Sequence, residues 1–382
     1  MTEPSAALPA AADRPPTVPF PLVEVSGSAR ARGQQYGRLA GERIARCIDI
    51  YKVAFVEKQV DWAQARSIAR AFLPRIEAFS ALMADEMYGI AAGADVPVED
   101  IVAINARTEL LYGKHAGHIP GQTPPDDDGC TGAIALPAAT ASGRLLHGQN
   151  WDWRDECADC GVVLHIVPDE GPRILCFVEA GMMARAGMNS AGVAITGNFL
   201  ECEQDARRQG VPAPIIRRQV LMSAGLGDAV QTVMKSPRAF SNNLMVSQSG
   251  GEAVNLETTP DEVFWMLPEQ DLLVHANHFV TQAARAKVRD TSLPMNGDSL
   301  YRDRRVRAHL ERAHGRITVE TFKEAFQDRY GSPRAVCRTA TVGPGGRISS
   351  TVATIIMDPA EGRMWIAPRP YGPHAFTEYQ LT

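Results

Sequence analysis

In the stretch DDDGCTGAIALPAATASGRLLHGQNWDW, residues 126–153, the sequence changes from a helical pattern to one of short strands. Its acidic start belongs to a longer run, GQTPPDDDG at residues 121–129, in which Pro, Asp and Gly cluster as they do in loops. Two short apolar segments follow, residues 131–138 and 144–151, and small residues separate them. This spacing predicts a β-hairpin that begins directly after the acidic loop.

The residues before and after this stretch follow different patterns. Before it, residues 29–64 and 73–92 carry apolar side chains at helical spacing, and a further helix is expected just after Pro97. After it, helical patterns occur near 214–234 and 299–313, between short apolar segments at hairpin spacing. Those segments are 162–168, 173–180, 192–200, 243–248, 253–258, 262–267, 351–358 and 363–368. Helices first and hairpins afterwards predict an α+β layered fold with largely antiparallel sheets.

The composition is that of a globular protein, since 45% of the 382 residues are hydrophobic and 22% are charged. The net charge is −5 with no basic stripe, which argues against a nucleic-acid partner, and no apolar run is long enough for a membrane span. Seven cysteines, an odd number spread along the chain, do not form the pattern of a secreted disulfide framework. Residues 1–21 are rich in Pro and Ala and lack signal-peptide features, so we expect a disordered leader and a cytoplasmic protein.

Cys130 is the candidate nucleophile. The ordinary interpretation of a cysteine at the start of a strand is a buried thiol. Three features favour another interpretation: an accessible loop precedes it, Gly129 leaves an unhindered carbonyl, and the following strand would hold a new N-terminus at a sheet edge. If the chain is cut between these two residues, the Cys130 thiolate can attack a carbonyl and its own α-amino group can serve as the base. The thiol can make this cut itself, through an N-to-S acyl shift and hydrolysis of the thioester.

The segment around Cys130 resembles the processing site of the isopenicillin-N acyltransferase family of N-terminal nucleophile hydrolases, which is related to the choloylglycine hydrolases. The resemblance extends to residues 87–110, to GMNSAGVAITGNFL at 187–200, to HANHF at 275–279 and to SLYRDRRV at 299–306. It therefore covers nearly all of the chain.

This resemblance implies a four-layer αββα sandwich with antiparallel sheets. It implies self-cleavage into a helical α chain, residues 22–129, and a β chain, residues 130–382, that carries the catalytic sheets. The two chains are expected to remain associated because the front helices are apolar. The resemblance also implies a possible homo-oligomer of αβ units.

The resemblance also assigns the groups at the cleavage site. Cys130 matches the nucleophile, which cleavage of the Gly129–Cys130 bond exposes. Asp152, in GQNWDW, matches the aspartate that contacts the new α-amino group, and a carboxylate there would orient and tune the amine. No cofactor or metal is expected, because the nucleophile, the base and the oxyanion donors are all protein groups.

Further residues are matched to the oxyanion and to the thiol. Asn198, in TGNF, matches an oxyanion-side asparagine of the choloylglycine hydrolases, and Asn243, in SNNLMV, is the choice for a second donor, with Asn242 as its alternative. Arg302, in SLYR, matches an arginine near the nucleophile, where it would keep the thiol ionised. Gln149 stands where choloylglycine hydrolases carry arginine, and this departure points to the acyltransferase branch.

Two other motifs could indicate a metal or redox site. Cys157 and Cys160 form a C-x-x-C, but no second pair completes a zinc site, and we expect ordinary thiols. His275 and His278 in HANH are expected to have a structural or pocket-shaping role.

The sequence thus predicts an enzyme that hydrolyses a small linear amide through a Cys130 acyl-enzyme. An acyl-CoA-dependent N-acyltransferase is the close alternative. An unprocessed, non-catalytic binding protein with a buried structural Cys130 is the third hypothesis.

Overall fold

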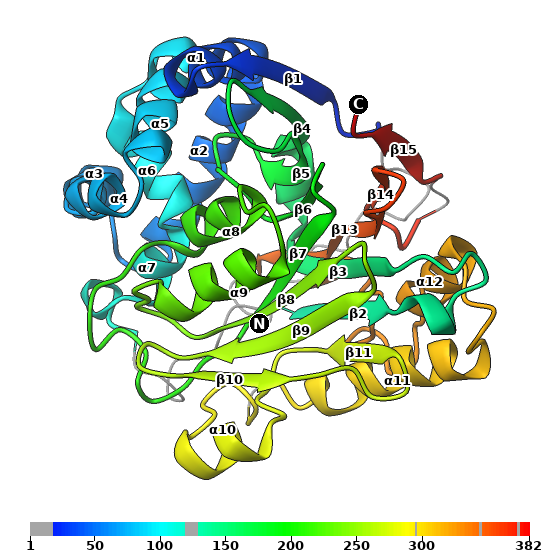
Figure 1. Cartoon of the computed structure of the whole chain (residues 1–382). Coiled ribbons are helices and arrows are strands. Elements are labelled where there is room, and N and C mark those ends of the chain that lie inside the picture. The colour runs from blue at the N-terminus through cyan, green and yellow to red at the C-terminus, as the bar shows by residue number, and fades with distance from the viewer. Residues whose placement is uncertain (1–17, 119–128, 295, 344–345, 373–374) are drawn as a thin grey trace.

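The computed structural model describes residues 18–118, 129–294, 296–343, 346–372 and 375–382, and the strands within these ranges form two sheets (Figure 1). The first sheet has the order β1–β4–β5–β6–β7–β8–β9–β10. Its strands are β1 (Leu22–Gly27), β4 (Gly161–Pro168), β5 (Ile174–Glu179), β6 (Ala186–Asn189), β7 (Val193–Phe199), β8 (Asn242–Gln248), β9 (Glu252–Thr258) and β10 (Val263–Met266). β1 runs parallel to β4, whereas the other neighbours in this sheet are antiparallel.

The second sheet contains the hairpin that follows the acidic loop. Its order is β11–β2–β3–β13–β14–β15, and β12 pairs with β13 at one end. The strands are β2 (Gly129–Ala135), β3 (Leu146–Arg154), β11 (Leu272–His275), β12 (Thr341–Val342), β13 (Ile348–Asp358), β14 (Arg363–Pro368) and β15 (Thr377–Gln380). All of these pairings are antiparallel.

Helices cover the outer face of each sheet. The front of the chain supplies α1 (Ala29–Leu39), α2 (Gly41–Val56), α3 (Trp62–Arg70), α4 (Leu73–Phe79), α5 (Ala81–Ala94), α6 (Val98–Asn105) and α7 (Arg107–Tyr112). With α8 (Ala213–Leu221) and α9 (Leu226–Lys235), these helices pack on the side of the first sheet. On the second sheet lie α11 (Ser299–Arg312) and α12 (Val319–Phe326), and α10 (Gln282–Lys287) precedes them in the chain. The short helical turns are η2 (Lys114–Ala116), η3 (Pro137–Ala139) and η4 (Asp155–Cys160).

The two sheets pack face to face. His147 of β3 reaches across the interface, with Nδ1 2.9 Å from Ser247 Oγ and Nε2 2.9 Å from Thr196 Oγ1. Burial lowers the pKa of this imidazole to about 3, so it remains neutral between the sheets. Helices, two sheets and helices again make the four-layer αββα sandwich, and the predicted fold class is confirmed.

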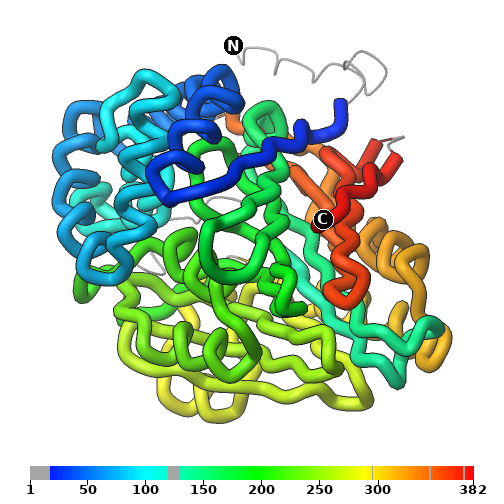
Figure 2. The backbone as a smooth tube through the Cα atoms, turned by 45° about the horizontal axis from the view of Figure 1, so that its top comes forward, coloured from blue at the N-terminus to red at the C-terminus, as the bar shows by residue number. Residues whose placement is uncertain are grey.

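The front of the chain differs from the sequence-based expectation in one respect. It is not only helical, because β1 adds a parallel strand to the edge of the first sheet. Figure 2 shows that the N-terminal end of this strand lies near the C-terminal strands. The Tyr379 hydroxyl donates a hydrogen bond to the carbonyl of Phe20, just before β1. Phe20 is buried and packs on Phe177, so residues 18–21 of the expected leader include an anchored segment. Residues 1–17 lie outside the described residues.

The predicted hairpins are present as β2–β3, β4–β5, β8–β9–β10 and β13–β14. The helical pattern near 214–234 corresponds to two helices, α8 and α9, which residues 222–225 separate. None of the helices in the described ranges combines the length and the apolar character that a membrane span requires.

Candidate active site

Cys130 is the second residue of β2, which lies between β11 and β3 in the second sheet. β3 pairs with the whole of β2, whereas β11 pairs only with residues 132–135. The backbone of Cys130 therefore has a strand on one side only, and the chain that leaves β11 at His275 passes along the other side. The thiol is almost completely buried. Most of the loop before it lies outside the described residues.

Asn277, two residues after β11, binds the backbone of Cys130. Its Oδ1 accepts the N–H of Cys130 at 2.6 Å, and its Nδ2 donates to the carbonyl of Phe199 at 2.8 Å. The backbone N–H of Asn277 donates to Ser299 Oγ at 2.8 Å. The side-chain amide is therefore held at both ends, with its oxygen on the atom that becomes the α-amino nitrogen if the chain is cut before Cys130.

Arg302, from α11, lies against the same residue. Its Nη1 donates to the carbonyl oxygen of Cys130 at 2.6 Å and to Thr131 Oγ1 at 3.0 Å, and its Nη2 donates to Asn277 Oδ1 at 2.9 Å. The structure thus places Arg302 next to Cys130, where its guanidinium contacts the backbone carbonyl of Cys130 and the side-chain amide of Asn277.

Asp152, from β3, lies beside Gly129. The register of the hairpin sets the two residues opposite each other, and a Cβ on Gly129 would lie only 2.8 Å from Asp152 Oδ2. Thr351 donates to Asp152 Oδ1 at 2.6 Å, and Arg338 Nε lies 3.2 Å from Oδ2. The absence of a side chain at residue 129 is therefore what lets this carboxylate approach the Gly129–Cys130 bond.

Asp298 joins the two arginines. Arg302 Nε donates to its Oδ2 at 2.8 Å, and Arg338 Nη2 donates to the same oxygen at 2.6 Å. Burial opposes ionisation of Asp298, but the two guanidinium groups outweigh burial and hold its pKa below the usual range. A connected chain of charged groups thus runs from Asp152 through Arg338, Asp298 and Arg302 to the backbone of Cys130.

Asn198, on β7, faces the second sheet but has another set of partners. Its Nδ2 donates to the carbonyls of His275 and Ala276, both at 2.9 Å, and its Oδ1 accepts from Gln149 Nε2 at 2.7 Å. In this arrangement both hydrogens of the amide hold the segment that leads to Asn277. An oxyanion role for Asn198, as expected from the sequence, would require it to exchange these bonds.

The neighbours Asn242 and Asn243 face opposite sides of β8. Asn242 Oδ1 accepts from Arg217 Nη2 at 3.0 Å, and Asn242 lines the same small cavity as Cys130. Asn243 pairs with Asn198 in the register and faces the space between the sheets. Both polar atoms of its buried side-chain amide lack a hydrogen-bond partner among the described residues.

The HANH motif contributes its asparagine to the site rather than a pair of metal ligands. His275 Nε2 lies 2.8 Å from Glu257 Oε1, and His278 Nδ1 lies 2.7 Å from Ser299 Oγ. Among the described residues, no group of three or more His, Cys, Asp and Glu side chains is placed to hold a metal ion. Cys157 and Cys160 are buried thiols in the core.

Sequence reasoning did not select Asn277, Arg338 or Asp298. The motif HANHF was cited for the family resemblance and for its histidines, and its asparagine, Asn277, was not considered. Nothing in the local sequence marks Arg338 or Asp298, since isolated arginines and aspartates are usually solvated surface residues.

Positive charge surrounds the cavity next to Cys130. Three buried arginines line it: Arg107 from α7, Arg185 before β6 and Arg217 from α8. The guanidinium of Arg185 stacks on Trp151, 3.8 Å from the ring centroid, and Arg185 also pairs with Glu179. Fixed positive charge at this place favours a ligand or a reaction intermediate that is negatively charged.

A family model matches residues 139–369, more than half of the chain, and it is the model of acyl-coenzyme A:6-aminopenicillanic acid acyl-transferase. The chain belongs to this family. The resemblance recognised from the sequence is confirmed. Membership makes the protein an enzyme of the acyltransferase class, and the hypothesis of a non-catalytic binding protein is therefore wrong. The matched range includes Asp152, Asn198, Asn277, Arg302 and Arg338, and it begins after Cys130.

One relative within this class is the 40 kDa form of acyl-coenzyme A:6-aminopenicillanic-acid-acyltransferase from Emericella nidulans. It is 27% identical over 88% of this chain and 89% of its own length. Among solved structures, a mutant of the conjugated bile acid hydrolase from Clostridium perfringens gives a TM-score of 0.44 at 14% identity, over 66% of this chain and 98% of that one. The penicillin V acylase from Agrobacterium tumefaciens gives 0.40 at 13%, over 63% and 83%. These structural similarities are too low to bear on the chemistry of the site.

Proposed function

We propose that this enzyme is a self-processing amidohydrolase that cleaves a small linear amide through a thioester on Cys130. The observation that carries the proposal is the set of contacts around the backbone of one residue, Cys130. The Cys130 nitrogen binds Asn277, the Cys130 carbonyl binds Arg302, and Asp152 lies beside Gly129. Buried, charge-linked groups rarely converge on a single backbone position unless that position has a chemical task.

Self-processing is the first step. The Cys130 thiol adds to the Gly129 carbonyl carbon, the peptide C–N bond breaks, and the Gly129 acyl group moves to sulfur while the amine of Cys130 is released. Water then hydrolyses the thioester, which returns the thiol and leaves a carboxylate on Gly129. The freed amine lies within reach of Asn277 Oδ1, and Asp152 supplies a nearby carboxylate.

Amide cleavage uses the same thiol. The amine of Cys130 takes the thiol proton, sulfur attacks the substrate carbonyl, and the amine returns the proton to the leaving group. Asn243 is our proposed side-chain donor to the oxyanion, because its buried amide has both polar atoms without a partner among the described residues. Water then takes the acyl group. Asn277 orients the amine, and Arg302 holds the backbone of Cys130.

Acyl transfer from acyl-CoA to an amine is the second candidate. The family name and the relative from Emericella nidulans favour it, since both are described as acyl-coenzyme A-dependent transferases. The two activities share the acyl-enzyme and differ only in whether water or an amine accepts the acyl group. The fate of a labelled acyl group, measured with and without an added amine, separates them.

The deciding experiment is the intact mass under denaturing and reducing conditions. We expect two fragments that sum to the whole chain plus one water, with the break between Gly129 and Cys130. Cys130→Ala should give a single chain without amidase activity. An unbroken wild-type chain, or full amidase activity in Cys130→Ala, would contradict the proposal. Alkylation at neutral pH provides a second check, because an N-terminal nucleophilic cysteine should be labelled rapidly.

A further inference from the structure

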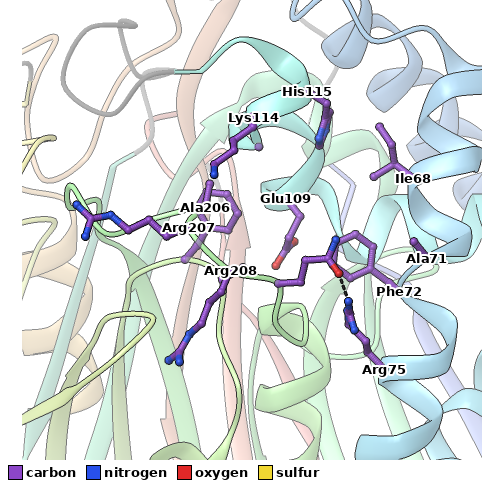
Figure 3. Close-up of a pocket in the computed structure, with 14 residues that line it drawn as sticks. Ile68, Ala71, Phe72, Arg75, Glu109, Lys114, His115, Ala206, Arg207 and Arg208 are labelled. Atoms are coloured by element: carbon purple, nitrogen blue, oxygen red, sulfur yellow. Dashed lines mark hydrogen bonds between the residues drawn. The ribbon is translucent and has the colours of Figure 1, made fainter.

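A second, larger cavity lies beside the helix that leads toward the nucleophile. Its volume is about 440 Å³, and it lies between the front helices α3 and α4, the end of α7 and residues 206–209 (Figure 3). Ile68, Phe72 and Phe240 give it apolar walls. Arg75, Lys114 and Arg208 are exposed at its rim, where water screens their charge.

This cavity adjoins the Cys130 site through a small intermediate space. The cavity beside Cys130 and the intermediate one each measure about 30 Å³, and they share Thr108, Ala213 and Asn242 as lining residues. The intermediate cavity and the large one share Glu109 and Phe240. Consecutive residues of α7 thus line the three neighbouring cavities, from Arg107 beside Cys130 to Glu109 in the large cavity.

Glu109 is a buried carboxylic acid that lines both the large and the intermediate cavity. Its carboxylate points into the large cavity in Figure 3, the residue is 6% exposed, and its Oε2 has no hydrogen-bond partner among the described residues. Burial raises the pKa of Glu109 to about 7, although Arg107 on the same helix opposes the shift. A buried carboxyl oxygen without a donor costs free energy, and a ligand that supplies the donor removes that cost.

We propose that the large cavity binds the distal part of the substrate, and that Glu109 selects an apolar segment that carries a hydrogen-bond donor, an amine or a hydroxyl. The apolar walls accommodate the segment, and the unpartnered Glu109 oxygen receives the donor. The inference rests on the proposed function, because it takes Cys130 as the point at which the other end of the substrate reacts.

The test compares anilides of straight-chain carboxylic acids of increasing length, each with a methyl, hydroxyl or amino group at the far end. Wild type should favour the hydroxyl or amino form over the methyl form by about tenfold or more in kcat/KM at the length that reaches Glu109. Glu109→Leu should abolish this preference. Glu109→Gln keeps an acceptor oxygen without the charge, so it should retain preference for a hydroxyl and lose it for an amine. Glu42→Gln, on the exposed face of α2, is the matched control and should leave the ratios as in wild type.

A second readout does not need turnover. Iodoacetamides that carry the same three tails should label Cys130 of the processed wild type faster with a hydroxyl or amino tail than with a methyl tail, and Glu109→Leu should remove the difference. Equal labelling rates and equal kcat/KM values for all tails in wild type would overturn the inference. If that result came with intact processing and amidase activity, the proposed function would stand. If Cys130 were neither exposed by cleavage nor labelled, both proposals would fail.

Discussion

The Asn277 side chain binds both the backbone of Cys130 and the guanidinium of Arg302. Its oxygen accepts from both the Cys130 nitrogen and Arg302, and the whole residue is buried. Asn277→Ala leaves the amine of Cys130 without its acceptor, so we expect kcat to fall about 100-fold, with a much smaller change in KM. Steady-state kinetics on the processed enzyme measure the split.

The matched control for this variant is Asn105→Ala. That change removes an equally buried amide, whose hydrogen bonds go to the backbone of Ile101, Gly181 and Met183. We expect it to lower the free energy of unfolding and to leave kcat of the folded protein near the wild-type value. If both variants reduced kcat alike, Asn277 would have only a structural role.

The raised pKa of Glu109 leads us to expect that the free energy of unfolding depends on pH. Its pKa of about 7 in the folded state lies above the ordinary carboxyl value, so the folded protein holds this proton more tightly than the unfolded chain does. Wild type should therefore lose stability relative to Glu109→Gln as the pH rises through about 4.5 to 7. We expect the variant to be more stable by about 1–3 kcal/mol near pH 8, with little difference near pH 4.5. Urea unfolding at the two pH values tests this, and an equal difference at both would contradict it.

At the scale of elements, α1 and α5 pack through glycines that allow their backbones to touch. A Cβ on Gly37 would lie 2.3 Å from the carbonyl oxygen of Ile90, and one on Gly33 would lie 2.1 Å from that of Glu86. Because the obstacle is backbone, no rotamer change relieves it, and Gly37→Ala should cost about 1–3 kcal/mol or more in the free energy of unfolding. Gly227→Ala on α9 meets no atom within 4 Å and should stabilise by about 0.5–1 kcal/mol. Denaturant unfolding of both variants provides the comparison, and similar effects would be evidence against close packing of α1 on α5.

At the scale of the whole molecule, Glu86 connects the front helices to the part of the chain after Cys130. Its carboxylate pairs with Arg32 of α1 at 2.8 Å and with Arg218 of α8 at 2.9 Å, and all three side chains are buried. Glu86→Ala leaves two buried guanidinium groups without their anion, which should cost about 3–5 kcal/mol. If the chain is cut before Cys130 as proposed, gel filtration in increasing urea should show that the two fragments of the variant separate at lower urea than those of wild type. Separation at the same urea concentration would show that Glu86 does not hold the chains together.

The features that could be predicted from the sequence are those that depend on nearby residues. The β2–β3 hairpin follows from two apolar segments and a short turn, and its register alone sets Asp152 opposite Gly129. The division into front helices and later hairpins was also correct, because periodicity and turn residues are local signals. Arg302 became a candidate only through the family resemblance.

The tertiary structure alone decided which distant groups meet at Cys130. Asn277 lies 147 positions from Cys130 in the chain, and the Cys130–Arg302 contact spans 172 positions. Tertiary packing also brings the Asn198 amide to the backbone of Ala276, just before Asn277. It likewise buries Glu109 beside α3, α4 and the loop at 206–209. Amides and charged side chains occur throughout any sequence without a periodic signature. Their partners are set by how the sheets and helices pack, and packing joins residues that no local pattern connects.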